Sequence, residues 1–468
     1  MEAEALLRDI TDYCRKTGVA ESTFGRLVVN DGKFVNRLRD GGRITTTTFQ
    51  RVRAYIAGGT PVDSGVNGFS SLDPGTGIRS PQPYVLGTSP QPPASKEHNF
   101  RFFDNRQKYL LFVHTCSEKA LVAQRASMEL ANIHPRPPAM RVFDAGVGDG
   151  TVLTRVMRAM HSRFSTTPFY IVGKEISLEA VRLTLEKMPD RFCEHPATVL
   201  VMTNLYYREA PWLVPGSVPA ATSLVWHELP LAGTTAHQFE DQIAALAPFL
   251  MESWRAHVSP TSGNPVYERP AVLVIYRDDH RFLLDPIIPR RGGAKADYDL
   301  VIASQPYRAR SPIDFKVSRV IAPLAKSLNP GGRLLAIHSH GNDPGLEILQ
   351  GVWPGENPFR HDRHQMLKAI KEILGGATRN LNFNTYSDAR SLFRYQMHAL
   401  PSEISDSIGN STLFAAWNAA TYVGQIEDAR LEAVMSNRRY LEITGQVLQK
   451  HGGLWFWDES FVMSRHRD

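Results

Sequence analysis

The chain has 468 residues, of which 42% are hydrophobic and 21% charged. This composition is that of an ordinary globular protein. The length allows two or three domains, each with its own core. No apolar run reaches membrane-spanning length and Met1–Glu4 begins no signal pattern, so we expect a cytoplasmic protein. Three widely spaced cysteines indicate neither a disulfide framework nor a zinc site, and we expect no metal.

Residues 1–57 are predicted to form a small helical domain. Helical spacing of apolar residues over Glu4–Lys16 is followed by a second helix from Ala20, and Lys33–Arg39 and Phe49–Ile56 continue the pattern after turns. Between Ser22 and Ile56 there are seven basic and two acidic residues, so most of the chain's net charge of +6 lies here.

This order of helices and turns is similar to the helix-turn-helix domains of repressor-like DNA-binding proteins. The resemblance implies that a recognition helix presents four residues to phosphates and base edges: Lys33, Asn36, Arg37 and Arg39. The alternative is a helical docking or dimerisation unit with a solvated basic face. Because repressor-like units commonly pair, a homodimer is also expected.

Residues 58–95 are rich in Gly, Pro, Ser and Thr and predict a flexible linker. The alternative is an extended arm that packs on the following domain through Pro83–Leu86. Residues 96–468 then form the second predicted domain, which opens with one or two amphipathic helices between Tyr109 and Asn132.

A strand, a tight turn and a helix are predicted at Met140–Met157. The strand ends in Asp144, and Gly146, Gly148 and Gly150 follow at alternating positions before the helix begins. Glycines bring the backbone close to a ligand, and the helix start offers unpaired N–H groups, so this unit suits a polar cofactor. A second strand ends in Glu175, where a carboxylate can accept both ribose hydroxyls of an adenosine group.

The pattern D-x-G-x-G-x-G at Asp144–Gly150 resembles the first motif of the class I S-adenosylmethionine-dependent methyltransferases. A dinucleotide site would need a third glycine where Thr151 stands. The resemblance implies a doubly wound, Rossmann-like α/β sheet of seven strands with the last antiparallel, and S-adenosyl-L-methionine as cofactor. It also implies that Asn204 and Leu205, at the end of the third strand, contact the adenine ring, although Asn204 also fits an ordinary loop.

The segment Glu209–Lys295 is longer than this fold requires. It contains an apolar stretch at Ser223–Leu229, a predicted helix at Phe239–Trp254 and a strand-like run at Ala271–His280. Insertions of this size more often carry substrate recognition than fold, so we expect a substrate-side subdomain or lid. Whether one of its strands joins the main sheet is left open.

A buried strand from Asp297 ends in Ser304-Gln305-Pro306-Tyr307, which looks like the polar-Pro-Pro-aromatic motif of amino-group methyltransferases with Gln305 in place of the first proline. The resemblance implies that Ser304, Gln305 and Tyr307 face the transferred methyl group. A helix at Phe315–Leu328 and the turn Asn329–Gly332 resemble the family's fifth-strand region. His338 at the end of that strand is a candidate general base, or a hydrogen-bonded structural residue.

The tail is predicted to contain helices at His364–Leu374 and Leu431–Gln449, a sixth strand at Phe393–His398 and a seventh at Leu454–Met463. The apolar stretch Ser411–Tyr422 fits either the core or the wall of an acceptor pocket.

Two functions follow from these patterns. The first is a methyltransferase acting on an undefined acceptor, either a small molecule or an amino group of a nucleic acid. The second is a DNA-binding transcriptional regulator whose methyltransferase fold only senses S-adenosylmethionine or a metabolite.

Overall fold

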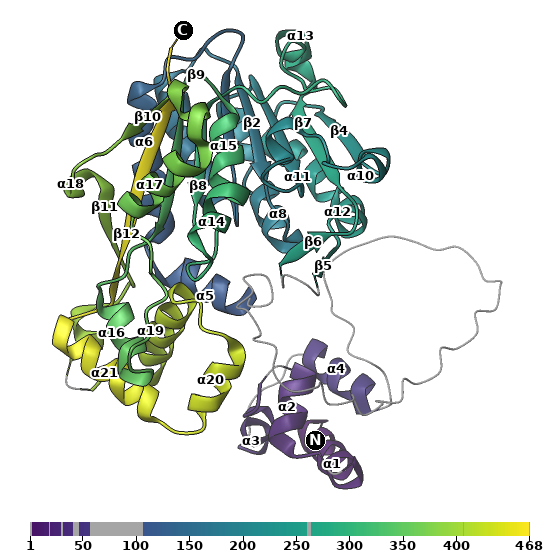
Figure 1. The fold of residues 1–468 in the computed structure, drawn as a ribbon. Helices are drawn as coiled ribbons and strands as arrows, with labels where there is room; N and C mark the ends of the chain where they lie inside the picture. The colour runs from purple at the N-terminus through teal and green to yellow at the C-terminus, as the bar shows by residue number, and fades with distance from the viewer. Residues whose placement is uncertain are drawn as a thin grey trace, which may run out of the picture. The chain divides into compact units, whose positions relative to one another are not determined.

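The computed structural model describes residues 2–17, 19–29, 31–40, 46–56, 106–259, 264–405 and 407–467. The chain divides into two compact units, Met1–Pro92 and Pro93–Asp468, and each is described by itself (Figure 1). The predicted linker at 58–95 lies outside the described residues. Across the part that is described, no helix has the length and apolar character needed to cross a membrane.

The described residues of the first unit form four helices: α1 (Glu2–Thr17), α2 (Glu21–Val29), α3 (Phe34–Arg39) and α4 (Thr46–Ile56). Their apolar faces form one core, which includes Ile10, Phe24 and Leu38. Gly25 lets α2 approach the turn before α3, because a Cβ at this position would lie 2.4 Å from the carbonyl oxygen of Asp31. Helices therefore form where the apolar spacing predicts them.

A ten-stranded mixed sheet forms the centre of the second unit. Its order is β10-β12-β9-β8-β1-β2-β3-β7-β4, and β11 also pairs with β12. The bounds are β1 (Met140–Asp144), β2 (Phe169–Lys174), β3 (Thr198–Thr203), β4 (Val225–Leu231), β7 (Ala271–Arg277), β8 (Tyr298–Ser304), β9 (Leu328–Ser339), β10 (Leu381–Asn384), β11 (Leu392–Gln396) and β12 (Trp455–Arg465). The sheet thus has more strands than the seven that the resemblance implied.

The strands in the middle of the sheet are parallel, and the direction in which successive strands are added to the sheet reverses at β1. From β1 the chain moves outward through β2 to β3, and it later returns to the other side of β1 with β8 and then β9. This is the doubly wound arrangement, with its switch point between β1 and β8. The last strand, β12, runs antiparallel to β9.

Two strands of the long insertion join this sheet, which answers the question that the sequence left open. β7 pairs antiparallel with β3, and β4 pairs parallel with β7 at the sheet edge. Two further short strands, β5 (Ala256–Val258) and β6 (Pro265–Tyr267), form a separate pair.

Three predicted elements have different limits in the structure. The helix predicted at Phe239–Trp254 is two helices, α11 (Ala236–Ala244) and α12 (Ala247–Ser253), because a proline near the start of α12 supplies no N–H to continue α11. The helix predicted at Leu431–Gln449 is also two, α20 (Asp428–Met435) and α21 (Arg439–His451), with the Asn437 side chain accepting a hydrogen bond from the Arg439 amide at the break. The predicted sixth strand is β11, which pairs with the start of β12, while β10 pairs with its end.

Side chains alternate between two cores on the faces of the sheet. In β1, Val142 lies in one core and Phe143 in the other, and β2, β3, β8 and β9 repeat the alternation. The first core is covered by α6 (Glu118–Glu129), α7 (Thr151–Arg163), α8 (Leu178–Leu185), α9 (Pro189–Glu194), α11 and α12. The second is covered by η5, a π-helical turn (Lys316–Ile321), α15 (Ala322–Lys326) and α17 (Arg363–Leu374).

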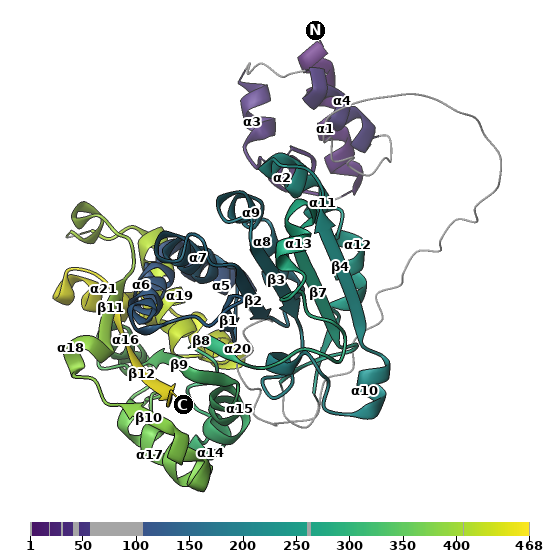
Figure 2. The same ribbon diagram turned by 90° about the horizontal axis from the view of Figure 1, so that it is seen from above.

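A third core contains residues from the beginning and from the end of the second unit. It contains residues of α5 (Arg106–Thr115), α16 (Pro344–Val352), α19 (Asn410–Val423), α20 and α21. Figure 1 shows these helices gathered at one end of the sheet, and Figure 2 shows the same arrangement from above. The remaining short helices are α10 (Val218–Thr222), α13 (Arg281–Leu284), α14 (Ile313–Phe315) and α18 (Asp388–Ser391).

Candidate functional site

A cavity of about 910 Å³ lies at the carboxyl ends of β1, β2 and β8 in the second unit. In doubly wound sheets this edge, at the switch point, is where ligands bind. Six of the residues nominated from the sequence line it: Gly146, Gly148, Glu175, Ser304, Gln305 and Tyr307.

The carboxylate of Glu175 is held by three backbone amides. Its Oε2 accepts a hydrogen bond from the Gly148 amide at 3.0 Å, and its Oε1 accepts from the amides of Ile176 and Ser177 at 2.8 and 2.9 Å. The backbone carbonyl of Glu175 accepts from the indole Nε1 of Trp254, on the insertion, at 2.9 Å. The carboxylate is therefore fixed in direction at the wall of the cavity.

The three glycines after β1 serve different purposes. At Gly148, where φ is +59°, a Cβ would lie 2.8 Å from the hydroxyl of Tyr109, which crosses the turn from α5 and accepts from the Asp149 amide. At Gly150, with φ +80°, it would lie 2.9 Å from the Cα of Thr184 in α8. At Gly146 the nearest atom would be 4.0 Å away, so this glycine leaves open space in the cavity.

Asp144 lies buried beneath the same turn. Its Oδ1 accepts from the Gly146 amide at 3.1 Å, and its Oδ2 has no hydrogen-bond partner among the described residues. Burial is the main cause that raises the pKa of Asp144 to about 6, and Glu175 raises it further, whereas the Gly146 amide and Lys119 lower it. The positive charge of Lys119 therefore offsets only part of the effect of burial on this carboxylate.

The turn after β8 carries backbone strain. Gln305 has φ +47°, a conformation that side chains other than glycine seldom adopt. Its side-chain nitrogen Nε2 donates to the Ser339 hydroxyl at 3.0 Å and to Asp458 Oδ1 at 3.2 Å, which holds the strained turn against β9 and β12. The hydroxyl of Ser304 is buried and has no hydrogen-bond partner within the described residues.

Tyr307 begins a chain of hydrogen bonds that leads away from the cavity. Its hydroxyl lies 2.6 Å from His338 Nδ1, and His338 Nε2 lies 2.8 Å from Glu459 Oε1. Burial raises the pKa of Tyr307 well above its usual value. Although burial opposes it, hydrogen bonds with His338 and His340 hold the pKa of Glu459 well below its usual value. An ionised carboxylate at the end of the chain can stabilise a protonated imidazole.

Four other residues nominated from the sequence lie in the second unit but do not line the cavity. Asn204 directs its side chain away from the cavity, donating to the carbonyls of Ser253 and Arg269 and accepting from the Ala271 amide. Leu205 is buried in the core, Gly150 packs against α8, and His338 reaches the cavity only through Tyr307. Asn204 and Leu205 do not line the cavity, because the insertion backbone that joins the sheet beside β3 takes the hydrogen bonds of Asn204.

The nominated DNA-contacting residues lie in the first unit and are exposed. Arg37 forms an ion pair with Asp31 at 2.5 Å, and Arg39 forms one with Glu21 at 2.8 Å. Arg39 also donates to the side chain of Asn36 at 3.1 Å. The Lys33 amide donates to the Asp31 carboxylate at 2.9 Å.

Several residues of the cavity were not nominated from the sequence as site residues. Tyr109, Glu118 and Lys119 come from the helices before β1, and Tyr422 comes from α19 near the other end of the chain. The ammonium group of Lys119 lies 3.4 Å from the carboxylate of Glu118. The sequence predicts helices ahead of β1, but which of their side chains face the cavity depends on how α5 and α19 pack together.

Comparison with known proteins gives matches among solved structures alone. No family model matches the sequence, and no curated protein sequence matches it. A putative sarcosine dimethylglycine methyltransferase from Galdieria sulphuraria is 10% identical, with 75% of this chain and 85% of that chain covered and a TM-score of 0.30. Loganic acid methyltransferase with SAH is 10% identical, with 81% and 99% covered and a TM-score of 0.32.

The plantazolicin methyltransferase BpumL in complex with SAH is 9% identical to this chain. The match covers 79% of this chain and 92% of that one, with a TM-score of 0.27. At such identities and TM-scores these matches support no assignment of activity, which depends on the residues of this chain.

The different surroundings of Gly146 and Gly150 predict different effects of the same substitution. Gly146→Ala adds a methyl group in open space, so the free energy of unfolding should change by less than about 1 kcal/mol. Gly150→Ala forces a positive φ and a contact with the Thr184 backbone, so it should cost at least about 1–2 kcal/mol. Urea unfolding of both variants measures this difference. Equal stabilities would contradict the packing described here.

The raised pKa of Asp144 predicts how stability depends on pH. Because the folded pKa, about 6, exceeds the ordinary value of an aspartate, about 4, ionisation of Asp144 destabilises the fold as pH rises from about 4 to above 6. Asp144→Asn removes this ionisation, so at pH 7 the variant should be more stable than the natural chain by up to about 3 kcal/mol. Urea unfolding of both proteins at pH 4, 5, 6 and 7 measures the difference. A difference that stays constant over this range would contradict the assignment.

Proposed function

We propose that this chain is an S-adenosylmethionine-dependent methyltransferase. The observation that carries the proposal is that Gly146, Glu175 and Tyr307, from the ends of three strands, line one cavity at the switch point of a doubly wound sheet. The order of these residues along the chain is the one that the family resemblance requires. The acceptor is a small molecule or an amino group of a nucleic acid.

The residues at the cavity fit the cofactor. The Glu175 carboxylate, fixed by three amides, suits the ribose hydroxyls, and the open space at Gly146 admits the methionine part. The buried Asp144, with an unpartnered oxygen, suits a neighbouring positive charge. S-adenosylmethionine, when bound, supplies an electrophilic methyl group on a sulfonium. Ile176 and Tyr206, which both line the cavity, are proposed for the adenine contact first given to Asn204 and Leu205.

The chain from Tyr307 to Glu459 is suited to remove a proton from the acceptor. The Tyr307 hydroxyl can accept a proton from an acceptor O–H or N–H while it passes its own proton to Nδ1 of His338. The resulting imidazolium is stabilised by the ionised Glu459, in turn held by the Arg363 amide at 2.9 Å. Because Tyr307 relays the proton and does not keep a charge, its raised pKa does not prevent this role. Ser304 and Gln305 position the acceptor beside it.

Cofactor binding should depend on Glu175. We expect Glu175→Ala to weaken the binding of S-adenosylmethionine about 10- to 100-fold, because charge-assisted hydrogen bonds to the ribose are lost. Glu186→Ala, which changes the exposed residue directly after α8, is the matched control and should bind normally. Isothermal titration calorimetry measures both. Unchanged affinity in Glu175→Ala, or no binding by the natural chain, would overturn the proposal.

Turnover should depend on Tyr307. Radiolabelled S-adenosylmethionine and fractionated cell extract identify the acceptor fraction, and Tyr307→Phe should then lower the rate of transfer about 10²- to 10⁴-fold. Its affinity for the cofactor should stay the same, since the phenol oxygen is not assigned to cofactor binding. A rate equal to that of the natural chain would remove the relay from the mechanism.

We propose further that the first unit binds DNA, as a dimer, through the exposed Lys33 and Asn36 and through Arg37 and Arg39 once their internal ion pairs open. Lys33→Ala should weaken binding to duplex DNA and reduce its dependence on salt, as expected for the loss of one phosphate contact. Fluorescence anisotropy over a range of salt concentrations measures this, and an unaltered salt slope would contradict it. Tight, sequence-specific binding together with no labelled methyl product would favour the regulator over the enzyme.

A further inference from the structure

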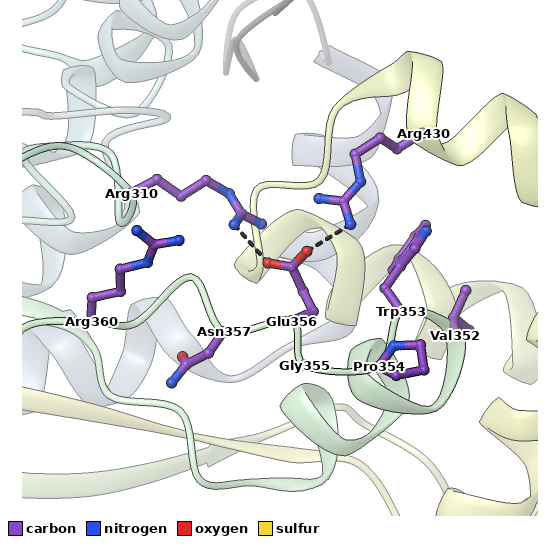
Figure 3. Close-up of a pocket in the computed structure, with 9 residues that line it drawn as sticks. All are labelled: Arg310, Val352, Trp353, Pro354, Gly355, Glu356, Asn357, Arg360 and Arg430. Carbon is purple, nitrogen blue, oxygen red and sulfur yellow. Dashed lines mark hydrogen bonds and ion pairs between the residues drawn. The ribbon is translucent and has the colours of Figure 1, made fainter.

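A second hollow, beside the cavity, carries an excess of arginine. It has a volume of about 700 Å³ and is shown in Figure 3. Its three arginines come from three segments: Arg310 from the loop after β8, Arg360 from the loop before α17, and Arg430 from α20. Trp353 and Glu356, in the turn after α16, also line it. We propose that this hollow binds an oxyanion group, a carboxylate or a phosphate, of the methyl acceptor; the inference rests on the proposed methyltransferase function.

Glu356 fixes two of the guanidinium groups. Its Oε1 accepts from Arg310 and its Oε2 from Arg430, each at 2.6 Å, as the dashed lines in Figure 3 show. Although burial raises it, these two arginines hold the pKa of Glu356 below its usual value, so the carboxylate is ionised. Arg430 also lies over the ring of Trp353, 4.9 Å from its centroid. Both guanidinium groups are therefore preorganised before any ligand binds.

Positive charge remains after these pairs are formed. Glu356 is the only acid among the described residues that line the hollow, so three guanidinium groups face one carboxylate. Arg360 has no carboxylate within ion-pair distance among the described residues, and Figure 3 shows its side chain extending toward the Arg310 side. A planar guanidinium donates two parallel hydrogen bonds to a carboxylate or a phosphate, which makes this set suitable for one oxyanion group.

Arg310 connects this hollow with the cavity. It lines both, and it follows Tyr307 by three residues in the same loop. The loop is held in place because the Ala309 amide donates to the Gln425 side chain at 3.0 Å and Arg310 donates to the Gly424 carbonyl at 3.3 Å. An acceptor whose anionic group contacts Arg310 can thus place its nucleophilic atom near Tyr307. This contact would select anionic acceptors over neutral ones of the same shape.

The test uses the full chain with inorganic pyrophosphate and succinate as separate probes of the two oxyanion chemistries. Calorimetric titration at low salt should show that the natural chain binds at least one probe, and that Arg360→Ala and Arg430→Ala each weaken it about tenfold or more. Arg158→Ala, which removes an exposed arginine on α7 remote in sequence from the hollow, is the matched control and should bind normally. Absence of binding to both probes, or an equal loss in Arg158→Ala, would overturn the proposal.

A parallel measurement separates this site from the cofactor site. Arg360→Ala should bind S-adenosylmethionine with the affinity of the natural chain, while it transfers label to the acceptor fraction at least about tenfold more slowly. Normal transfer by Arg360→Ala would show that the hollow does not hold the acceptor. If the natural chain binds S-adenosylmethionine but neither probe, the oxyanion site fails and the proposed function stands. If it does not bind S-adenosylmethionine, the proposed function fails.

Discussion

The hydrogen bond from the Gly148 amide to the Glu175 carboxylate joins the turns that follow β1 and β2. The two turns also interlock by shape, since a Cβ on Gly173 in β2 would lie 2.7 Å from a methyl group of Val147. The Tyr109 hydroxyl also packs against the turn after β1, and this close contact is possible because Gly148 has no side chain. The position of the cavity wall depends on this contact, and the proposed binding of an adenosine group depends on that wall.

The insertion supports the site from the side more than it covers it. Its strand β7 extends the sheet beside β3, and Trp254 donates to the Glu175 carbonyl. Of the insertion's described residues, 209–259 and 264–295, only Asn264, Pro265 and Val266 line the cavity. The aromatic cover comes instead from α5 and α19, where Tyr109 and Tyr422 lie 6.1 Å apart between ring centroids. Under the proposed function, substrate selection would lie with the segments around Tyr307, Arg310 and α19.

Local patterns predicted what is local in this protein. The glycine spacing after Asp144 and the acid at the end of β2 depend on a single strand-turn-helix unit, and both lie where the sequence indicated. Asn204 shows the limit, because an asparagine at a strand end looks the same whether its amide meets a ligand or, as here, the backbone of an insertion. Glu459 carried no signal, and Tyr422 lay in a stretch that fitted either the core or a pocket wall, because both reach the site only after β12 pairs with β9 and α19 packs on α5.

A crystal structure of the chain with S-adenosylhomocysteine would show whether the cavity binds the cofactor. We expect electron density for the ligand in the cavity, with both ribose hydroxyls within hydrogen-bond distance of the Glu175 carboxylate, the amino-acid part beside Gly146, and the sulfur directed toward Ser304 and Tyr307. Ligand density at another place, or a ribose directed away from Glu175, would contradict this prediction.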